Sequence, residues 1–244
     1  MTDPADLHAH YDAMWQRAHP SIAAGTVECD TPLAAGPDPR RGLTLIARPG
    51  AALAARCDAL LERLDGAEPG QFRQPAPDLH VTILSLFTVA DDYAAMLARL
   101  DDYRAAVRAA VAGIPPFEIA FDGIAVSRGA VLARGHPAGP ALETLRERLR
   151  GALRERGLDG TLDGRYRLVT AHATLLRFVR PLRDAAGFAQ LLEALRDAPL
   201  GTMRVEEVKL VVNDWTMSAA ALRDIDTLRL VQGAHEVRTL HASN

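Results

Sequence analysis

Hydrophobic and polar positions follow two periods along the chain from residue 42 onward. Short runs rich in Leu, Ile, Val, Phe and Thr are typical of strands, whereas apolar residues three and four positions apart are typical of amphipathic helices. The pattern predicts strands at 42–47, 79–87, 117–126, 129–135, 167–178, 203–214 and 226–233. It predicts helices at 51–64, from residue 91 or 92 to about 111, within 130–157 and at 184–197. Strands and helices therefore alternate along most of the chain.

The first 41 residues have a less regular pattern. Residues 7–18 predict a short helix, and three X-Pro pairs between residues 31 and 39 interrupt regular structure after it. We therefore expect residues 1–41 to form an N-terminal extension that lies over the main body.

The order of the predicted elements repeats. Residues 43–66 and 130–157 share a strand, an Ala-Arg pair, a Pro/Gly break and an amphipathic helix, and the strand at 203–214 matches the strand at 117–126. Such a repeat indicates a duplicated unit, here of about 85–90 residues. A duplication gives pseudo-twofold symmetry, which brings equivalent strands of the two copies face to face.

Two segments, 42–128 and 129–244, are therefore expected as the two lobes of one integrated domain. Each contains one His-x-Thr sequence inside a predicted strand, His80-Val81-Thr82 in the first and His172-Ala173-Thr174 in the second. Residues i and i+2 of a strand project from the same face, so each motif presents an imidazole beside a hydroxyl. Two such pairs facing each other would surround one small anion.

This set of side chains suits the cleavage of a phosphodiester. That reaction needs a base for the nucleophile, an acid for the leaving oxygen and hydrogen-bond donors for the non-bridging oxygens. Histidine can perform both proton transfers because its ordinary pKa of about 6.5 lies near working pH. Two imidazoles and two hydroxyls then suffice, and the scheme needs no metal or other cofactor.

The segments HVTILSL (80–86) and HATLLRF (172–178) lie about 90 residues apart in a duplicated α/β arrangement. With them, residues 42–233 resemble the two-histidine (2H) phosphoesterase superfamily. That family includes bacterial RNA 2′,3′-cyclic phosphodiesterases, often named 2′-5′ RNA ligases, and other cyclic-nucleotide phosphodiesterases. The resemblance implies a bilobal α+β fold in which duplicated β-α-β units form two antiparallel sheets that face a central cleft, with helices outside.

The resemblance also implies an activity and its residues. It implies metal-independent hydrolysis of a 2′,3′-cyclic or 2′-5′ phosphodiester in a small nucleotide or RNA end, with His80 and His172 as acid and base and with Thr82 and Thr174 binding phosphate. Which histidine is the acid stays open. The extension and residues 213–224 fall outside the matched pattern.

Other functions remain open at this point. Each histidine also fits a core position, with its imidazole satisfied by neighbouring hydroxyls. The same cleft could hold a nucleotide or RNA end without turning it over. A third alternative is a ligase that joins RNA ends through a 2′-5′ linkage by the reverse reaction.

Four further residues are candidates for substrate binding. Phe72 and Arg73 lie in a loop before the first motif, Tyr166 lies just before the second predicted motif strand, and Trp215 follows the strand at 203–214. Aromatic rings stack on nucleobases and arginine pairs with phosphate, although each residue also fits an anchoring role in a loop or at a strand end. Arg177 follows Thr174 by three positions, so strict alternation places it away from the His172 face.

Composition limits the remaining possibilities. A formal net charge of −3 argues against a broad surface for duplex DNA. Cys29 and Cys57 have no CxxC spacing, which favours a reduced, cytoplasmic setting. The first residues resemble no secretory signal, and no apolar run is long enough to span a bilayer. We expect a monomer that does not associate with membranes.

Three histidines in the extension invite a metal interpretation. The spacing of His8, His10 and His19 fits no strong zinc pattern, and no cysteine or acidic partner is evident to complete a site. The sequence therefore predicts no metal site here.

Overall fold

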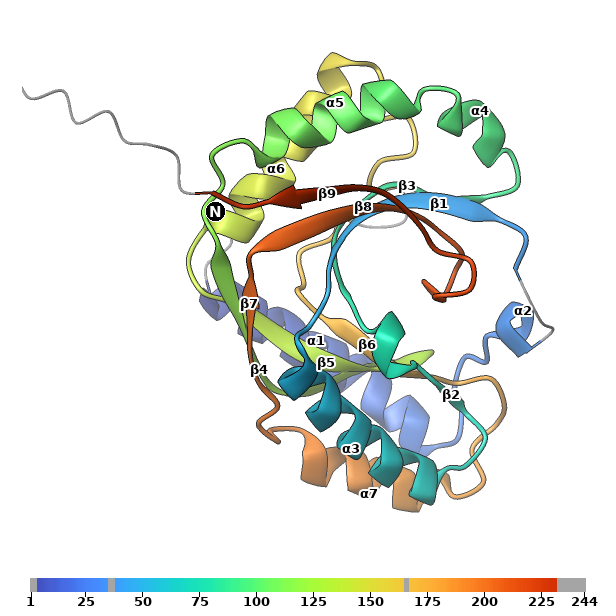
Figure 1. Ribbon diagram of the computed structural model, residues 1–244. Coiled ribbons are helices and arrows are strands. Elements are labelled where there is room, and N and C mark those ends of the chain that lie inside the picture. The colour runs from blue at the N-terminus through green and yellow to red at the C-terminus, as the bar shows by residue number, and fades with distance from the viewer. Residues whose placement is uncertain (1–3, 35–37, 165–166, 232–244) are drawn as a thin grey trace, which may run out of the picture.

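The computed structural model describes residues 4–34, 38–164 and 167–231, and its framework is two antiparallel β-sheets (Figure 1). The strand order is β3-β1-β8-β9 in the first sheet and β2-β6-β5-β4-β7 in the second. The first sheet contains β1 (Arg41–Ala47), β3 (Val81–Ala90), β8 (Glu207–Asn213) and β9 (Arg223–Arg229). The second contains β2 (Phe72–Arg73), β4 (Phe117–Ser127), β5 (Ala130–Pro137), β6 (Ala173–Arg177) and β7 (Gly201–Val205).

Helices cover the outer side of each sheet (Figure 1). The helical segments of the described chain are α1 (Pro4–Ala23), α2 (Thr31–Ala34), α3 (Ala51–Ala67), the 3₁₀ turn η1 (Ala76–Asp78), α4 (Tyr93–Leu97), α5 (Leu100–Val111), α6 (Ala141–Glu155) and α7 (Ala185–Leu195). The pair α5 and α6 packs on the first sheet, and the pair α3 and α7 packs on the second. The additional helix α1 packs against β4, β5 and α7. This arrangement confirms the expected α+β class, with antiparallel sheets inside and helices outside.

The four strands of the first sheet correspond to four of the five strands of the second, with β2 as the additional strand. The order β3-β1-β8-β9 matches β6-β5-β4-β7, and the unit β1-α3-β3 matches the unit β5-α6-β6. In each unit the helix packs on the sheet that does not contain the two strands it connects. Helix α3 packs near β6 and β7 of the second sheet, whereas α6 packs near β3 of the first. The repeated order agrees with a duplicated β-α-β unit.

The division of the chain at residue 128 does not coincide with the division into sheets. The first sheet takes β8 and β9 from the C-terminal segment, and the second sheet takes β2 and β4 from the N-terminal segment. The two halves are therefore interleaved. The division of the chain into two lobes, 42–128 and 129–244, remains a prediction about which segments arose by duplication.

Two expected elements are divided in the structure. The predicted strand at 203–214 is two strands, β7 and β8, which belong to different sheets and are separated by Glu206. The predicted helix from residue 91 or 92 to about 111 is α4 followed by α5. Periodicity reports which face of an element is buried, but it does not report which sheet or layer buries it.

The core is continuous from one layer of helices through both sheets to the other. The central strands β1 and β5 have long runs of buried residues, because each is covered by neighbouring strands and by packing on both faces. Among the described residues, no helix combines the length and the apolar character that crossing a membrane requires.

Candidate active site

A cavity of about 200 Å³ contains both His-x-Thr motifs. His80 and Thr82 line it from the first sheet, and His172 and Thr174 line it from the second. The two motifs are more than 80 residues apart in the sequence, yet they meet across this shared space. The geometry that the repeat predicted is therefore present.

The two histidines are held in equivalent ways. Each lies one residue before its strand, His80 before β3 and His172 before β6. The Nδ1 atom of His80 donates a hydrogen bond to the carbonyl oxygen of Asp78 at 2.8 Å, and the Nδ1 atom of His172 lies 2.7 Å from the hydroxyl of Thr170. In both cases the partner is two residues upstream. Each ring is thus fixed through Nδ1, which leaves Nε2 for chemistry.

Burial lowers the pKa of both imidazoles to about 4. Nearby positive charge contributes to this lowering of the pKa, from Arg48 and Arg177 at His80 and from Arg146 and Arg177 at His172. Both rings are therefore neutral at neutral pH when no anion is bound. An anion bound between the two rings would carry the opposite charge and would favour the imidazolium form of one of them.

A bulge in β3 brings one more side chain to the cavity. On β1, Thr44 and Ile46 lie two positions apart and share a face, yet their partners Ser85 and Thr82 lie three positions apart on β3. Ile83 is the extra residue of this bulge, and it restores Ser85 to the face of Thr82. Ser85 accordingly lines the cavity.

The equivalent bulge in β6 corrects the prediction for Arg177. On β5, Ala130 and Leu132 lie two positions apart, and their partners Arg177 and Thr174 lie three apart, with Leu175 as the extra residue. Arg177 therefore lines the cavity together with Thr174 instead of facing away from it. The expectation was wrong because it assumed unbroken alternation along the strand.

A sequence signal for both bulges exists. Each threonine is followed by two apolar residues and then a polar one, in HVTILS and in HATLLR. A half-buried strand that alternates strictly would show one apolar residue between polar positions. The doubled apolar residues mark the bulges and identify Ser85 and Arg177 as equivalent positions.

Arg146 of α6 joins the two motif segments. Its side chain is fully buried, at 1% exposed. The guanidinium donates to the carbonyl oxygens of Thr82 and Ile83 on one side, and to those of Val169 and Thr170 on the other, at 2.8–3.1 Å. Burial lowers its pKa to about 10, which still keeps it charged at neutral pH. Arg146 thus fixes both motifs relative to each other through their backbones.

The irregular segment before β6 has two further supports. Arg150 donates to the carbonyl oxygen of Leu168 at 3.3 Å. The buried hydroxyl of Tyr11 in α1 donates to the carbonyl oxygen of Gly135 at 3.1 Å and accepts from the backbone N–H of Ala171 at 3.3 Å. A side chain at Gly135 would collide with the Ala171 carbonyl oxygen. The N-terminal extension therefore helps to place the residue before His172.

The loop after β8 places Trp215 in the cavity lining. The indole N–H donates to a carboxylate oxygen of Asp30 at 2.6 Å, and the guanidinium carbon of Arg177 lies 5.1 Å from the ring centroid. The carboxylate of Asp78 accepts from the backbone N–H of Ala219 at 2.9 Å. This contact ties the loop to the residue whose carbonyl holds His80.

The other predicted substrate-binding residues have different locations. Phe72 and Arg73 form β2, which pairs with β6 at the edge of the second sheet. Arg73 forms ion pairs with Asp58 at 3.3 Å and Asp65 at 3.7 Å on α3. Within the described part of the chain, the cavity lining does not include Phe72 or Arg73. Tyr166 lies outside the described residues.

The family model of the 2′-5′ RNA ligase superfamily matches residues 51–215, a span that includes both His-x-Thr motifs. The chain belongs to this superfamily, whose members are the 2H phosphoesterases.

Solved structures share the fold. TT0787 of Thermus thermophilus aligns with a TM-score of 0.61 and 18% identity, covering 80% of this chain and 100% of its own. LigT of E. coli complexed with ATP aligns with a TM-score of 0.51 and 19% identity, over 80% and 100% of the two chains. LigT complexed with 3′-AMP gives 0.53 and 18%, over 79% and 99%. Comparison with curated proteins gives no significant match.

Proposed function

We propose that this protein is a metal-independent phosphodiesterase that hydrolyses 2′,3′-cyclic or 2′-5′ phosphodiester bonds in small nucleotides or RNA ends. The observation that carries the proposal is the convergence of two His-Thr pairs, from two equivalent strands, on one cavity. Membership of the 2′-5′ RNA ligase superfamily supports the same class of phosphate chemistry.

Hydrogen bonding to the two rings assigns their roles in this proposal. The Asp78 carbonyl can only accept, so His80 carries its proton on Nδ1 and presents the Nε2 lone pair of a base. The Thr170 hydroxyl can accept or donate, so it can satisfy His172 in both its neutral and its cationic form. We therefore assign His80 as the base and His172 as the acid.

The reaction then balances without another group. His80 takes a proton from water as the water oxygen bonds to phosphorus. His172 gives a proton to the ribose oxygen as its bond to phosphorus breaks. The hydroxyls of Thr82 and Thr174 and the guanidinium of Arg177 donate to the non-bridging oxygens, where negative charge develops. The product is a phosphomonoester, and both histidines have exchanged their protonation states.

The substrate class has its own support. Trp215 offers an aromatic face in the cavity lining, and aromatic rings stack on any nucleobase. The related E. coli LigT has been crystallised with ATP, with NADP+ and with 3′-AMP. We propose that a nucleobase stacks on Trp215 while its phosphate lies between the two threonines. The cytoplasmic setting expected from the sequence is part of the proposal, and the two free cysteines agree with it.

A screen of 2′,3′-cyclic mononucleotides and 2′-5′ dinucleotides in the presence of EDTA tests the proposal. We expect hydrolysis that chelation leaves unchanged, with a bell-shaped dependence of rate on pH. His80→Ala and His172→Ala should each lower turnover by roughly 10²–10⁴-fold. His10→Ala, on the exposed face of α1, is the matched control and should retain wild-type turnover. Tight binding without any product would contradict the proposal and identify a binding module.

The family match also supports a second candidate, a ligase that runs the reverse reaction. The same base would activate the 5′-hydroxyl in place of water, its oxygen would bond to the phosphorus of a 2′,3′-cyclic end, and the same acid would protonate the 3′ oxygen as its bond to phosphorus breaks. Incubating the protein with both ends and analysing the products separates the two functions. A 2′-5′-joined product identifies ligation, whereas an opened phosphomonoester identifies hydrolysis.

A further inference from the structure

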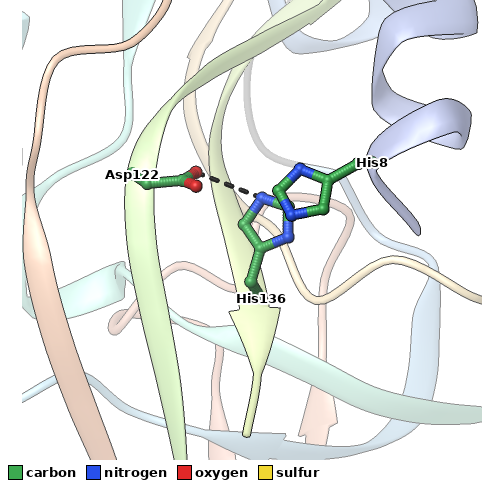
Figure 2. Close-up of side chains that lie close together, drawn as sticks. All are labelled: His8, Asp122 and His136. Atoms are coloured by element: carbon green, nitrogen blue, oxygen red, sulfur yellow. Dashed lines mark ion pairs between the residues drawn. The ribbon is translucent and has the colours of Figure 1, made fainter. Parts of the chain in front are cut away.

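Three potential metal ligands from distant parts of the chain meet on α1, β4 and β5 (Figure 2). They are His8, Asp122 and His136, and their ligand atoms all lie within 4.8 Å of one another. The Nε2 atom of His136 lies 3.1 Å from Asp122 Oδ1, and the rings of His8 and His136 stack with centroids 4.0 Å apart. These residues are separate from the two His-x-Thr motifs.

The local backbone explains why the three side chains converge. In β4 and β5, Phe121 pairs with Gly135 and Ile124 with Ala133, so Asp122 and Gly123 together oppose a single residue. Such a bulge changes the direction of the side chains it contains. His136 follows Gly135 directly, and the Tyr11 hydroxyl is hydrogen-bonded to Gly135. His8 precedes Tyr11 by one helical turn, so it lies on the same side of α1.

The charges around the cluster are compatible with a cation. Arg134 donates to Asp122 at 3.1 Å and to Asp197 at 2.9 Å, so two carboxylates share the positive charge of this guanidinium.

We propose that His8, Asp122 and His136 bind a divalent transition-metal ion of the zinc class. Two imidazoles and one carboxylate are typical zinc ligands, whereas Mg²⁺ and Ca²⁺ prefer oxygen ligands alone. Zinc–nitrogen distances of about 2.0–2.1 Å place tetrahedral ligands roughly 3.3 Å apart. His8 is exposed, so its side chain is free to turn toward the other two ligands.

The metal would act as a clamp between the extension and the second sheet. It joins α1 to β4 and β5 beside the Tyr11 contact, which in turn supports Ala171 next to His172. The ion stabilises this junction and takes no part in phosphodiester cleavage. The proposal is therefore independent of the function proposed above, and either can fail alone.

Calorimetric titration of Zn²⁺ into the metal-free full chain, prepared without a polyhistidine tag, tests the site. We expect saturable binding of one equivalent and a visible absorption spectrum typical of tetrahedral coordination when Co²⁺ is bound instead. At a hundredfold excess over Kd, Zn²⁺ should raise the Tm by about 5–10 °C. Mg²⁺ should produce neither effect.

Ligand variants decide whether the binding belongs to this cluster. Residues that merely support a ligand cost about 10–100-fold in metal affinity when removed, so His8→Ala should weaken Zn²⁺ binding at least as much. His8 is exposed, so this variant keeps the fold, and Asp122→Asn provides a second test. His10→Ala and Cys29→Ser are controls and should bind as wild type does. Unchanged affinity in His8→Ala, or no saturable binding by the wild type, overturns the proposal.

Discussion

The β3 motif and the β6 motif share a framework but differ in chemistry. Both place a histidine one residue before the strand, a threonine on the strand and a bulge immediately after that threonine. The β3 bulge then presents the neutral Ser85, whereas the β6 bulge presents the cationic Arg177. These different neighbours make the surroundings of the two histidines unequal. The comparison teaches that a duplicated scaffold can keep its geometry while single side chains break its symmetry.

The hydrogen-bond partners of the two Nδ1 atoms also differ between the two motifs. A carbonyl oxygen holds His80, and a hydroxyl holds His172. The segments that lead into the two histidines differ as well. The first is the short 3₁₀ turn η1, and the second is irregular and depends on Arg146, Arg150 and Tyr11.

The largest expected effect tests whether the two histidines have different roles. On a ribonucleotide substrate, His80→Ala and His172→Ala should both lose roughly 10²–10⁴-fold in kcat. On a p-nitrophenyl phosphodiester, whose leaving group needs no proton, His172→Ala should recover to within about tenfold of wild type. His80→Ala should not recover, since its nucleophile still lacks a base. Equal losses on both substrates would contradict the assignment.

The next effect concerns the side chain that the two motifs share. Arg146→Met leaves four carbonyl oxygens without their donor, so the free energy of unfolding in urea should fall by about 3–5 kcal/mol. The matched control is Arg148→Met on the same helix, where the side chain is exposed and the change should stay within about 0.5 kcal/mol. Similar values for the two variants would mean that Arg146 does not hold the motifs together.

The two bulge positions allow a direct comparison of the halves. Arg177→Ala removes a charged donor from the proposed phosphate site and should lower kcat by about 10²–10³-fold. Ser85→Ala removes an uncharged hydroxyl at the equivalent position, so we expect a loss below about tenfold. Steady-state kinetics on one cyclic nucleotide measures both. A larger loss of kcat in Ser85→Ala than in Arg177→Ala would contradict the assignment of Arg177 as the charged donor.

The last effect is the dependence of stability on pH. Both histidines have a folded pKa of about 4, below the ordinary value of 6.5, so the unfolded chain binds more protons between these limits. The free energy of unfolding should therefore fall as the pH decreases from about 6.5 to about 4. His80→Gln and His172→Gln should each reduce this slope by a similar amount in urea unfolding at several pH values. A slope that only one variant changes would show unequal burial of the two rings.

The features that were predicted correctly from the sequence are those that depend on local periodicity. The alternation of strands and helices, the repeat and the shared face of each His-Thr pair all follow from spacings of two, three or four residues. The cavity position of Trp215 was also among the predicted site residues. These features depend on neighbours in the chain, which the sequence displays directly.

Other features depend on neighbours in space. Arg177 was misplaced because a bulge adds one residue against the paired strand. The two adjacent apolar residues after Thr174 hint at this bulge, but only the pairing with β5 establishes it. Phe72 and Arg73 lie away from the cavity because β2 pairs at the edge of β6. No acidic partner of His8 was evident in the sequence because Asp122 lies more than 100 residues after it.

The crossing of α3 and α6 between the two sheets has a consequence for how this chain can change. Each β-α-β unit covers the sheet that the other unit builds, so neither unit encloses a core of its own. The two units therefore cannot separate into independent domains. A substitution beneath one helix also changes the packing of strands that belong to the other unit. Because the two units share one core, a change in either of them must remain compatible with the packing of the other.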